Sequence, residues 1–195
     1  MKRALALMLA VLSVAAPALA ETVSAPTITS TATVLDSFTI IVDLKRDIAG
    51  FPDIANDQQM NFGNLTIQGG TLNAVEGVVA FVTTNSHQDP YTVNSVIANP
   101  LTRSGGTQTI PNGAFVLNAA YAAADNGGAA NEGTVNYSGT AIGTHPLYVS
   151  GGTHSQRTVQ GHYYVGNQAP GSTTFIPADQ ADGVYTTNLI ISATR

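Results

Sequence analysis

The sequence predicts an all-β fold, an antiparallel sandwich or barrel built from many short strands. Three observations lead to this prediction. No stretch combines an apolar period of about 3.6 residues with convincing helix caps. Apolar side chains instead recur at every second residue in short runs, and Gly, Asn, Asp, Pro and Ser fill the gaps between the runs. Short strands separated by such turns are typical of antiparallel sandwiches and barrels.

The chain opens with a segment typical of a secretory signal peptide. Lys2 and Arg3 supply the charged start, an apolar run follows, and residues 18–20 (Ala-Leu-Ala) form a small-x-small cleavage site. The apolar run is too short and too rich in alanine for a membrane anchor. We therefore expect residues 1–20 to be removed, leaving a mature chain that starts at Glu21, is exported, and does not insert into a membrane.

The amino-acid composition argues against some classes of binding partner and against disulfide bonds. Cleavage would leave five of the seven basic residues against all twelve acidic ones, a net charge of about −7, which argues against a nucleic-acid or anionic-membrane partner. Charged residues make up only 10% of the chain, against roughly 25% in typical domains. The chain has no cysteine, so an exported form gains no disulfides and depends on its core or on assembly for stability.

The segment after the signal peptide carries a strand pattern about twice the usual length. Even-numbered positions from Ile28 to Leu44 form a mostly apolar stripe, and the odd positions from Thr27 to Thr33 are all threonine, which favours an extended backbone. Asp36-Ser37 divides the stripe. We expect the second half to pack in the chain's own core. The first half can pair with its own sheet, add to another subunit's sheet, or stay disordered.

Further strands are expected at short intervals along the chain. Residues 114–124 have helix-forming composition, but their alternation and flanking turns favour a strand. The clearest strand is the last one, residues 183–193, with Tyr185, Leu189 and Ile191 on one face. The other expected strands are residues 61–68, 75–84, 91–98, 107–110, 146–149, 158–165 and 173–176.

The sequence shows no recognisable catalytic or metal-binding motif. The four histidines, His87, His145, His154 and His162, lack zinc-site spacing. There is no Gly-x-Ser-x-Gly motif and no regular calcium loop. We therefore expect no enzyme activity, no cofactor and no bound metal.

Short motifs near both ends of the chain resemble subunits of chaperone–usher fimbriae. Residues 28–36 (Ile-Thr-Ser-Thr-Ala-Thr-Val-Leu-Asp) are similar to the mature start of alpha-class fimbrial major subunits of Gram-negative bacteria, which also lack cysteine. Asn61-Phe62-Gly63, residues 157–163 with Gln168, and Gly183-Val184-Tyr185 with the final strand resemble motifs of spore-coat-U-type pilins. The chain departs from the latter group by lacking its cysteine pair, and residues 98–155 resemble neither group.

The resemblance implies an incomplete immunoglobulin-like sandwich, residues 37–195, preceded by a donor-strand extension, residues 21–36. A periplasmic chaperone would fill the open groove first. The donor strand of the next subunit would replace it at an outer-membrane usher. The implied donor side chains are Ile28, Ser30, Ala32 and Val34, and the implied groove-edge residues are Tyr185, Leu189 and Ile191.

The implied function is that of a homopolymeric structural subunit of a cell-surface pilus, exported through the periplasm and supporting adhesion or biofilm formation. The alternative is a secreted, closed β-sandwich that binds carbohydrate or another surface ligand. Tryptophan is absent, so stacking faces for a sugar would have to come from tyrosines. The candidates are Tyr91, Tyr121, Tyr148, Tyr163 and Tyr164.

Overall fold

The computed structural model describes residues 38–54, 59–86, 91–121, 137–150, 157–166 and 172–194. The expected signal peptide and donor-strand extension lie outside these residues. The described part is almost entirely β-strand, with one 3-10 turn, η1 (Asn112–Ala114). The all-β, antiparallel prediction is thus confirmed. Among the described residues no helix is long and apolar enough to cross a bilayer.

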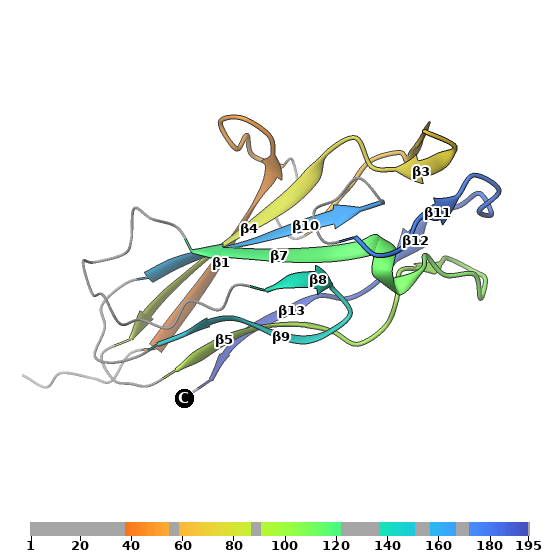
Figure 1. The fold of residues 1–195 in the computed structure, drawn as a ribbon. Coiled ribbons are helices and arrows are strands. Elements are labelled where there is room, and N and C mark those ends of the chain that lie inside the picture. The colour runs from red at the N-terminus through yellow and green to blue at the C-terminus, as the bar shows by residue number, and fades with distance from the viewer. Residues whose placement is uncertain are drawn as a thin grey trace, which may run out of the picture. The chain divides into compact units, whose positions relative to one another are not determined.

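Two antiparallel sheets form the body of the sandwich (Figure 1). The larger sheet has the order β1-β4-β10-β7-β8 and the smaller one the order β13-β5-β9. The larger sheet contains β1 (Phe38–Asp47), β4 (Gly77–Ser86), β10 (Arg157–Val165), β7 (Phe115–Tyr121) and β8 (Ser138–Thr140). The smaller sheet contains β13 (Ile190–Thr194), β5 (Thr92–Ile97) and β9 (Gly143–Val149).

Short strands complete the fold. They pair in the orders β11-β3-β2 and β12-β6. Their bounds are β2 (Thr66–Gln68), β3 (Thr71–Asn73), β6 (Thr102–Arg103), β11 (Ile176–Pro177) and β12 (Tyr185–Thr186). Figure 1 shows β3, β11 and β12 together beyond one end of the long strands.

The core lies between the two main sheets and follows from strict alternation along the strands. On β10 every second residue is buried, including Val159, Tyr163 and Val165. On β5 the buried residues include Val93 and Ile97. All of these side chains belong to one apolar cluster that both sheets share.

Four strand predictions differ from the structure. One of them, residues 173–176, shares only Ile176 with β11. The expected final strand is broken into β12 and β13, because the hydroxyl of Thr187 donates to the carbonyl of Asn99 at 2.6 Å and holds the intervening residues out of the ladder. The expected strand 61–68 is reduced to β2. The expected strand 107–110 contributes only an isolated bridge between Thr109 and Thr102.

Candidate functional site: the open side of the sandwich

One side of the sandwich is closed by a covalent corner. The chain passes from β8 in the larger sheet to β9 in the smaller sheet through Ala141 and Ile142. The backbone N–H of Ala141 donates to the carbonyl of Phe115 at 2.8 Å, which pins this corner to β7. Ala141 itself is fully buried. The two sheets are therefore joined along the β8–β9 side.

The opposite side is bounded by two edge strands, β1 and β13, and we call it the open side. Within the described residues, β1 pairs along its length with β4 alone and β13 pairs with β5 alone. The ring of Phe38 contacts that of Tyr91, with centroids 5.3 Å apart, and the next residue, Thr92, pairs with Thr194. The start of β1 and the end of β13 therefore lie at the same end of the sandwich.

The side chains on the inward face of β1 are more exposed toward the start of the strand than at Leu44. Leu44 faces the core and is only 7% exposed, whereas Val42 and Ile40, on the same face, are each 37% exposed. Apolar side chains of this size gain ~1.5–3 kcal/mol on full burial. Ile40 and Val42 point between the sheets but are not fully buried, so they contribute only part of this free energy to the stability of the single chain.

The backbone of the same residues points to the unpaired edge. The N–H of Arg46 donates away from β4, to the carbonyl of Pro52 at 2.9 Å. Because donors and acceptors alternate sides along an antiparallel strand, Val42 and Ile40 direct their N–H and C=O groups to that same edge, away from β4. Inward apolar side chains and backbone groups that point away from β4 thus coincide at Ile40 and Val42.

The second edge, β13, presents a matching face. Leu189, Ile191 and Ala193 pack against the core but are only partly buried. Their register opposite β5 pairs Ile191 with the buried Ser95 and Ala193 with the buried Val93, so these side chains face inward. The outward Ile190 is 60% exposed. The open side is therefore lined with apolar side chains on both edges.

Of the three residues expected at the groove edge, Leu189 and Ile191 lie on the open side. Tyr185 lies on a different strand, β12. Ile191 is on the inward face of β13, and Leu189, the residue just before β13, packs against the core. Tyr185 lies on β12, where its hydroxyl donates to the carbonyl of Ala181 at 2.6 Å and accepts from the amide of Gln180 at 2.7 Å. The expected donor residues Ile28, Ser30, Ala32 and Val34 lie outside the described residues.

The sequence interpretation missed the contribution of β1. It expected Phe38–Leu44 to pack in the chain's own core, which Leu44 does, whereas Ile40 and Val42 are only partly covered. The signal was present in the continuous stripe from Ile28 to Leu44. A period of two gives the face on which a side chain lies and not which segment covers that face.

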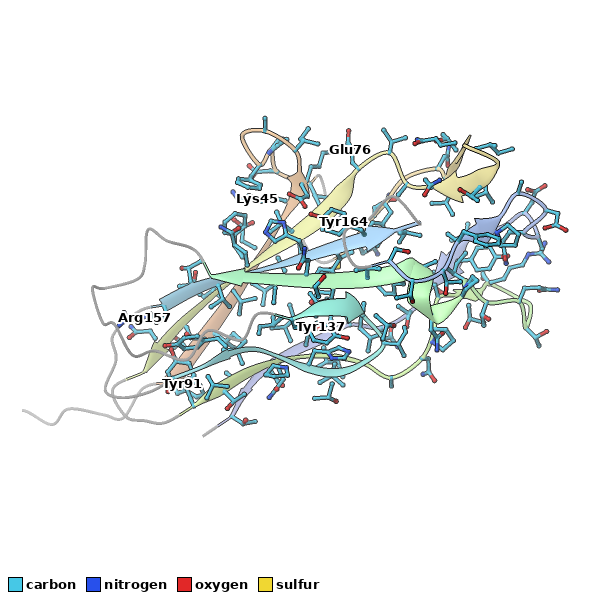
Figure 2. The ribbon with its side chains drawn as sticks, in the orientation of Figure 1. Lys45, Glu76, Tyr91, Tyr137, Arg157 and Tyr164 are labelled. Atoms are coloured by element: carbon cyan, nitrogen blue, oxygen red, sulfur yellow. The ribbon has the colours of Figure 1, made fainter. Side chains whose placement is uncertain are left out.

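A polar cluster on the outer face of the larger sheet fastens β1 to β10 (Figure 2). One carboxylate oxygen of Asp47 lies 2.9 Å from Nδ1 of His162 and also accepts the hydroxyl of Tyr164. Burial, and secondarily the Asp47 carboxylate, raise the pKa of Tyr164 above its ordinary value. Among the described residues no group of three His, Asp or Glu side chains is placed to hold a metal ion.

The tyrosines expected to offer stacking faces are mostly internal. Tyr91, Tyr148 and Tyr163 are essentially inaccessible to solvent, and Tyr164 is held by Asp47. The side chain of Tyr121 is outside those described. The predicted sugar-stacking faces are therefore not available at Tyr91, Tyr148 and Tyr163, whereas the ring of Tyr164 is only partly buried.

Comparison with known proteins does not assign the chain to a family. No protein-family model matches it, and no curated protein matches it.

Proposed function

We propose that this protein is an exported structural subunit of a surface pilus, polymerised when the N-terminal segment of one copy fills the open side of another. The observation that carries the proposal is the exposure of Ile40 and Val42 on an edge strand, at positions whose side chains face into the sandwich. A strand laid along this edge would cover both side chains and pair with their backbone groups.

The N-terminal segment has the pattern that such an edge accepts. Ile28, Ser30, Ala32 and Val34 alternate with threonines, so an extended segment would direct these four side chains between the sheets and its threonines to solvent. The side chains are small or medium in size. They would pack between the inward faces of β1 and β13, where large side chains already occupy part of the space.

A segment from another copy fits this side better than the chain's own segment folded back. Folding back onto β1 requires a tight reversal at Leu35-Asp36-Ser37. Short hairpin loops favour glycine, asparagine or aspartate at positions of positive φ, most often with a glycine, and these three residues include Asp36 but no glycine or asparagine. A continuous extended run from the stripe into β1 instead carries the segment away from its own sheet.

Strand insertion requires a small opening of the sandwich. β1 and β13 approach within 8 Å between Cα atoms, whereas two strands that flank a third lie about 9.6 Å apart, twice the usual spacing of ~4.8 Å. The two edges must therefore separate by roughly 2 Å where they are nearest. Burial of Ile40, Val42 and the donor side chains favours this separation.

The exposed edge also accounts for the proposed partners. An unpaired strand edge beside apolar side chains is a template for aggregation. A periplasmic chaperone that covers the open side would prevent it, and an outer-membrane usher would exchange the chaperone for the next subunit. Adhesion or biofilm formation would then be properties of the assembled fibre.

Deleting residues 21–35 tests the proposal in the native host. The truncated subunit keeps its open side but has no donor strand. We therefore expect it to fold and to remain bound to the chaperone, but not to assemble into fibres. Fibres sheared from cells and seen by electron microscopy provide the measurement. If the truncated protein is instead recovered from the periplasm as a stable monomer without the chaperone, the proposal is contradicted and a closed sandwich is favoured.

A matched pair of point variants refines the test. Ala32→Asp places a charge on the face that enters the sandwich and should abolish fibre formation, because burial of an unpaired charge is strongly unfavourable. Thr31→Asp places the same charge on the opposite face and should leave the fibre yield near that of the unaltered protein. Equal yields from the two variants would refute the assigned inward face.

A further inference from the structure

A short return segment covers one end of the free edge of β1. After β1 the chain reverses at a turn closed by the N–H of Phe51 donating to the carbonyl of Ile48 at 3.0 Å, with Gly50 at a φ of +85°. The segment then runs antiparallel along β1. It forms a bridge between Asp53 and Lys45, and the carbonyl of Pro52 accepts the N–H of Arg46 at 2.9 Å.

This return segment places an apolar side chain opposite Leu44. The antiparallel register of Asp53 opposite Lys45 places Ile54 opposite Leu44. Ile54 packs against the core. The exposure along β1 changes at this point, from 7% at Leu44 to 37% at Val42. Ile54 therefore lies where it can cover Leu44 on the inward face of β1.

Contacts on the outer face anchor the segment. The ring of Phe51 packs edge-on against that of Phe81, with centroids 5.4 Å apart. Phe51 adopts a φ of +44°, which is uncommon for a residue with a side chain and is compensated by such contacts. The ammonium of Lys45 lies 3.0 Å from Asp53 and 3.1 Å from Asp43. Figure 2 shows Lys45 beside this loop.

We infer that residues 51–54 form a built-in stop that limits the incoming strand to the first part of β1, from Phe38 to Asp43. This inference rests on the proposed function and deepens it. The edge beyond Asp43 is already paired, and the inward position beside Leu44 is already filled. An incoming strand therefore places its side chains beside Phe38, Ile40 and Val42 and no further along β1.

The stop also determines at which end of β1 the donor strand extends past the edge. The donor stripe has four inward side chains, Ile28, Ser30, Ala32 and Val34, whereas β1 has three inward positions ahead of Leu44, at Phe38, Ile40 and Val42. Since Ile54 blocks the far end, the fourth donor side chain must lie beyond the start of β1. The segment 51–54 thereby sets the register of the joint between subunits.

Disulfide trapping in the full-length chain tests the stop, because the chain has no native cysteine to interfere. Directly opposed residues on antiparallel strands have Cα atoms ~4.5–5.5 Å apart, within the range of ~4.4–6.8 Å that a disulfide spans. Ile40→Cys, Val42→Cys and Leu44→Cys are each combined with a cysteine at donor position 28, 30, 32 or 34. Cross-linked subunits appear as a ladder on non-reducing gels of assembled fibres.

We expect ladders from Ile40→Cys and Val42→Cys with at least one donor position each, and none from Leu44→Cys with any. The control combines Leu44→Cys with Ile54→Cys, which should close a disulfide within one chain and so show that the thiol at position 44 is reactive. Ladders from Leu44→Cys in the otherwise unaltered chain would overturn the stop and leave the proposed function intact. Ladders from no position would overturn both.

Removing the stop provides the second test. Pro52→Gly, Asp53→Gly and Ile54→Gly are combined to free the edge beside Leu44. In this background Leu44→Cys should yield ladders that the unaltered stop prevents. Asp43→Ala, which removes a surface ion-pair partner of Lys45 without touching residues 51–54, should not. An unchanged pattern of ladders in the triple variant would contradict the inference.

Discussion

The hydroxyl oxygens of Ser95 and Tyr163 lie 2.8 Å apart in the interior and join the two sheets of the sandwich. Ser95 is on β5 of the smaller sheet, and Tyr163 is on β10 of the larger one. Both side chains are fully buried. This polar link lies in an otherwise apolar core, so each hydroxyl depends on the other to replace the water it has lost.

Tyr163→Phe should therefore destabilise the protein, because it leaves the Ser95 hydroxyl buried with its principal partner removed. We expect a loss of ~1–3 kcal/mol in the free energy of unfolding, measured by denaturant titration. Ser95→Ala combined with Tyr163→Phe removes both polar groups and should recover part of that loss. A double variant as unstable as the sum of the single variants would show that the two hydroxyls are not coupled.

The same residue predicts alkaline sensitivity. Burial raises the pKa of Tyr163 to about 12 from an ordinary 10.0, against a smaller lowering by Ser95. A folded-state pKa above the unfolded value means that this stabilising contribution is complete below about pH 10 and is lost as the pH rises toward about 12. Roughly 2–3 kcal/mol is at stake over this interval.

Denaturant titrations between neutral and alkaline pH would measure this dependence. The Ser95→Ala, Tyr163→Phe double variant should lose less stability over the alkaline interval than the unaltered protein does. The pKa values of Tyr164 and Tyr137 are also raised, so the double variant and the unaltered protein should both keep some sensitivity to alkaline pH. Identical slopes in the two proteins would exclude Tyr163 as a contributor.

The attachment of β1 to β10 predicts a contrast between two aspartates on the same strand. Asp47→Ala removes the acceptor of both His162 and Tyr164 in a partly buried cluster, so we expect a loss of ~1–3 kcal/mol in unfolding free energy. Asp43→Ala breaks only a solvent-exposed contact with Lys45, which is worth ~0–1 kcal/mol. Thermal and denaturant unfolding of both variants provide the comparison, and similar losses would argue against the assigned role of Asp47.

Backbone geometry predicts a second contrast, between two glycines. Gly166 has a φ of +118°, and a Cβ added there would lie 2.9 Å from the Cα of Asn73. Gly63 has a φ of +69° and open space around it. Gly166→Ala should therefore cost more than Gly63→Ala, which carries only the conformational penalty of roughly 1 kcal/mol. Circular dichroism melting curves would rank the two, and the reverse order would be inconsistent with the packing at Asn73.

The sequence predicted the class of fold well, because alternation is a local property. The strands near residues 77–86, 92–97, 115–121 and 157–165 each carry enough alternating residues to be recognised. The short strands β3, β6 and β8 have two or three residues each and show no period. The break between β12 and β13 depends on the contact of Thr187 with Asn99, which local sequence does not reveal.

The candidate site was only partly predictable for a related reason. The apolar stripe predicted a strand at Phe38–Leu44 but not that this strand lies at an edge, and Leu189 and Ile191 were expected on the last strand. The partial exposure of Ile40 and Val42 depends on which neighbours are present in three dimensions. Ile54 is a single apolar residue in a turn-rich stretch, so nothing in the sequence marks it as the side chain that lies opposite Leu44.

Mixing two singly substituted subunits tests the central proposal most directly. One carries Ala32→Cys in the N-terminal segment and the other carries Val42→Cys or Ile40→Cys on β1. Each chain has only one thiol, so a bond between the donor and acceptor positions has to join different molecules. We predict that fibres co-assembled from the two populations contain a disulfide-linked dimer of the two kinds of subunit, identified by mass spectrometry. Complete absence of that dimer, together with an intrachain bond when both cysteines are placed in one monomeric chain, would show that the segment folds onto its own sheet.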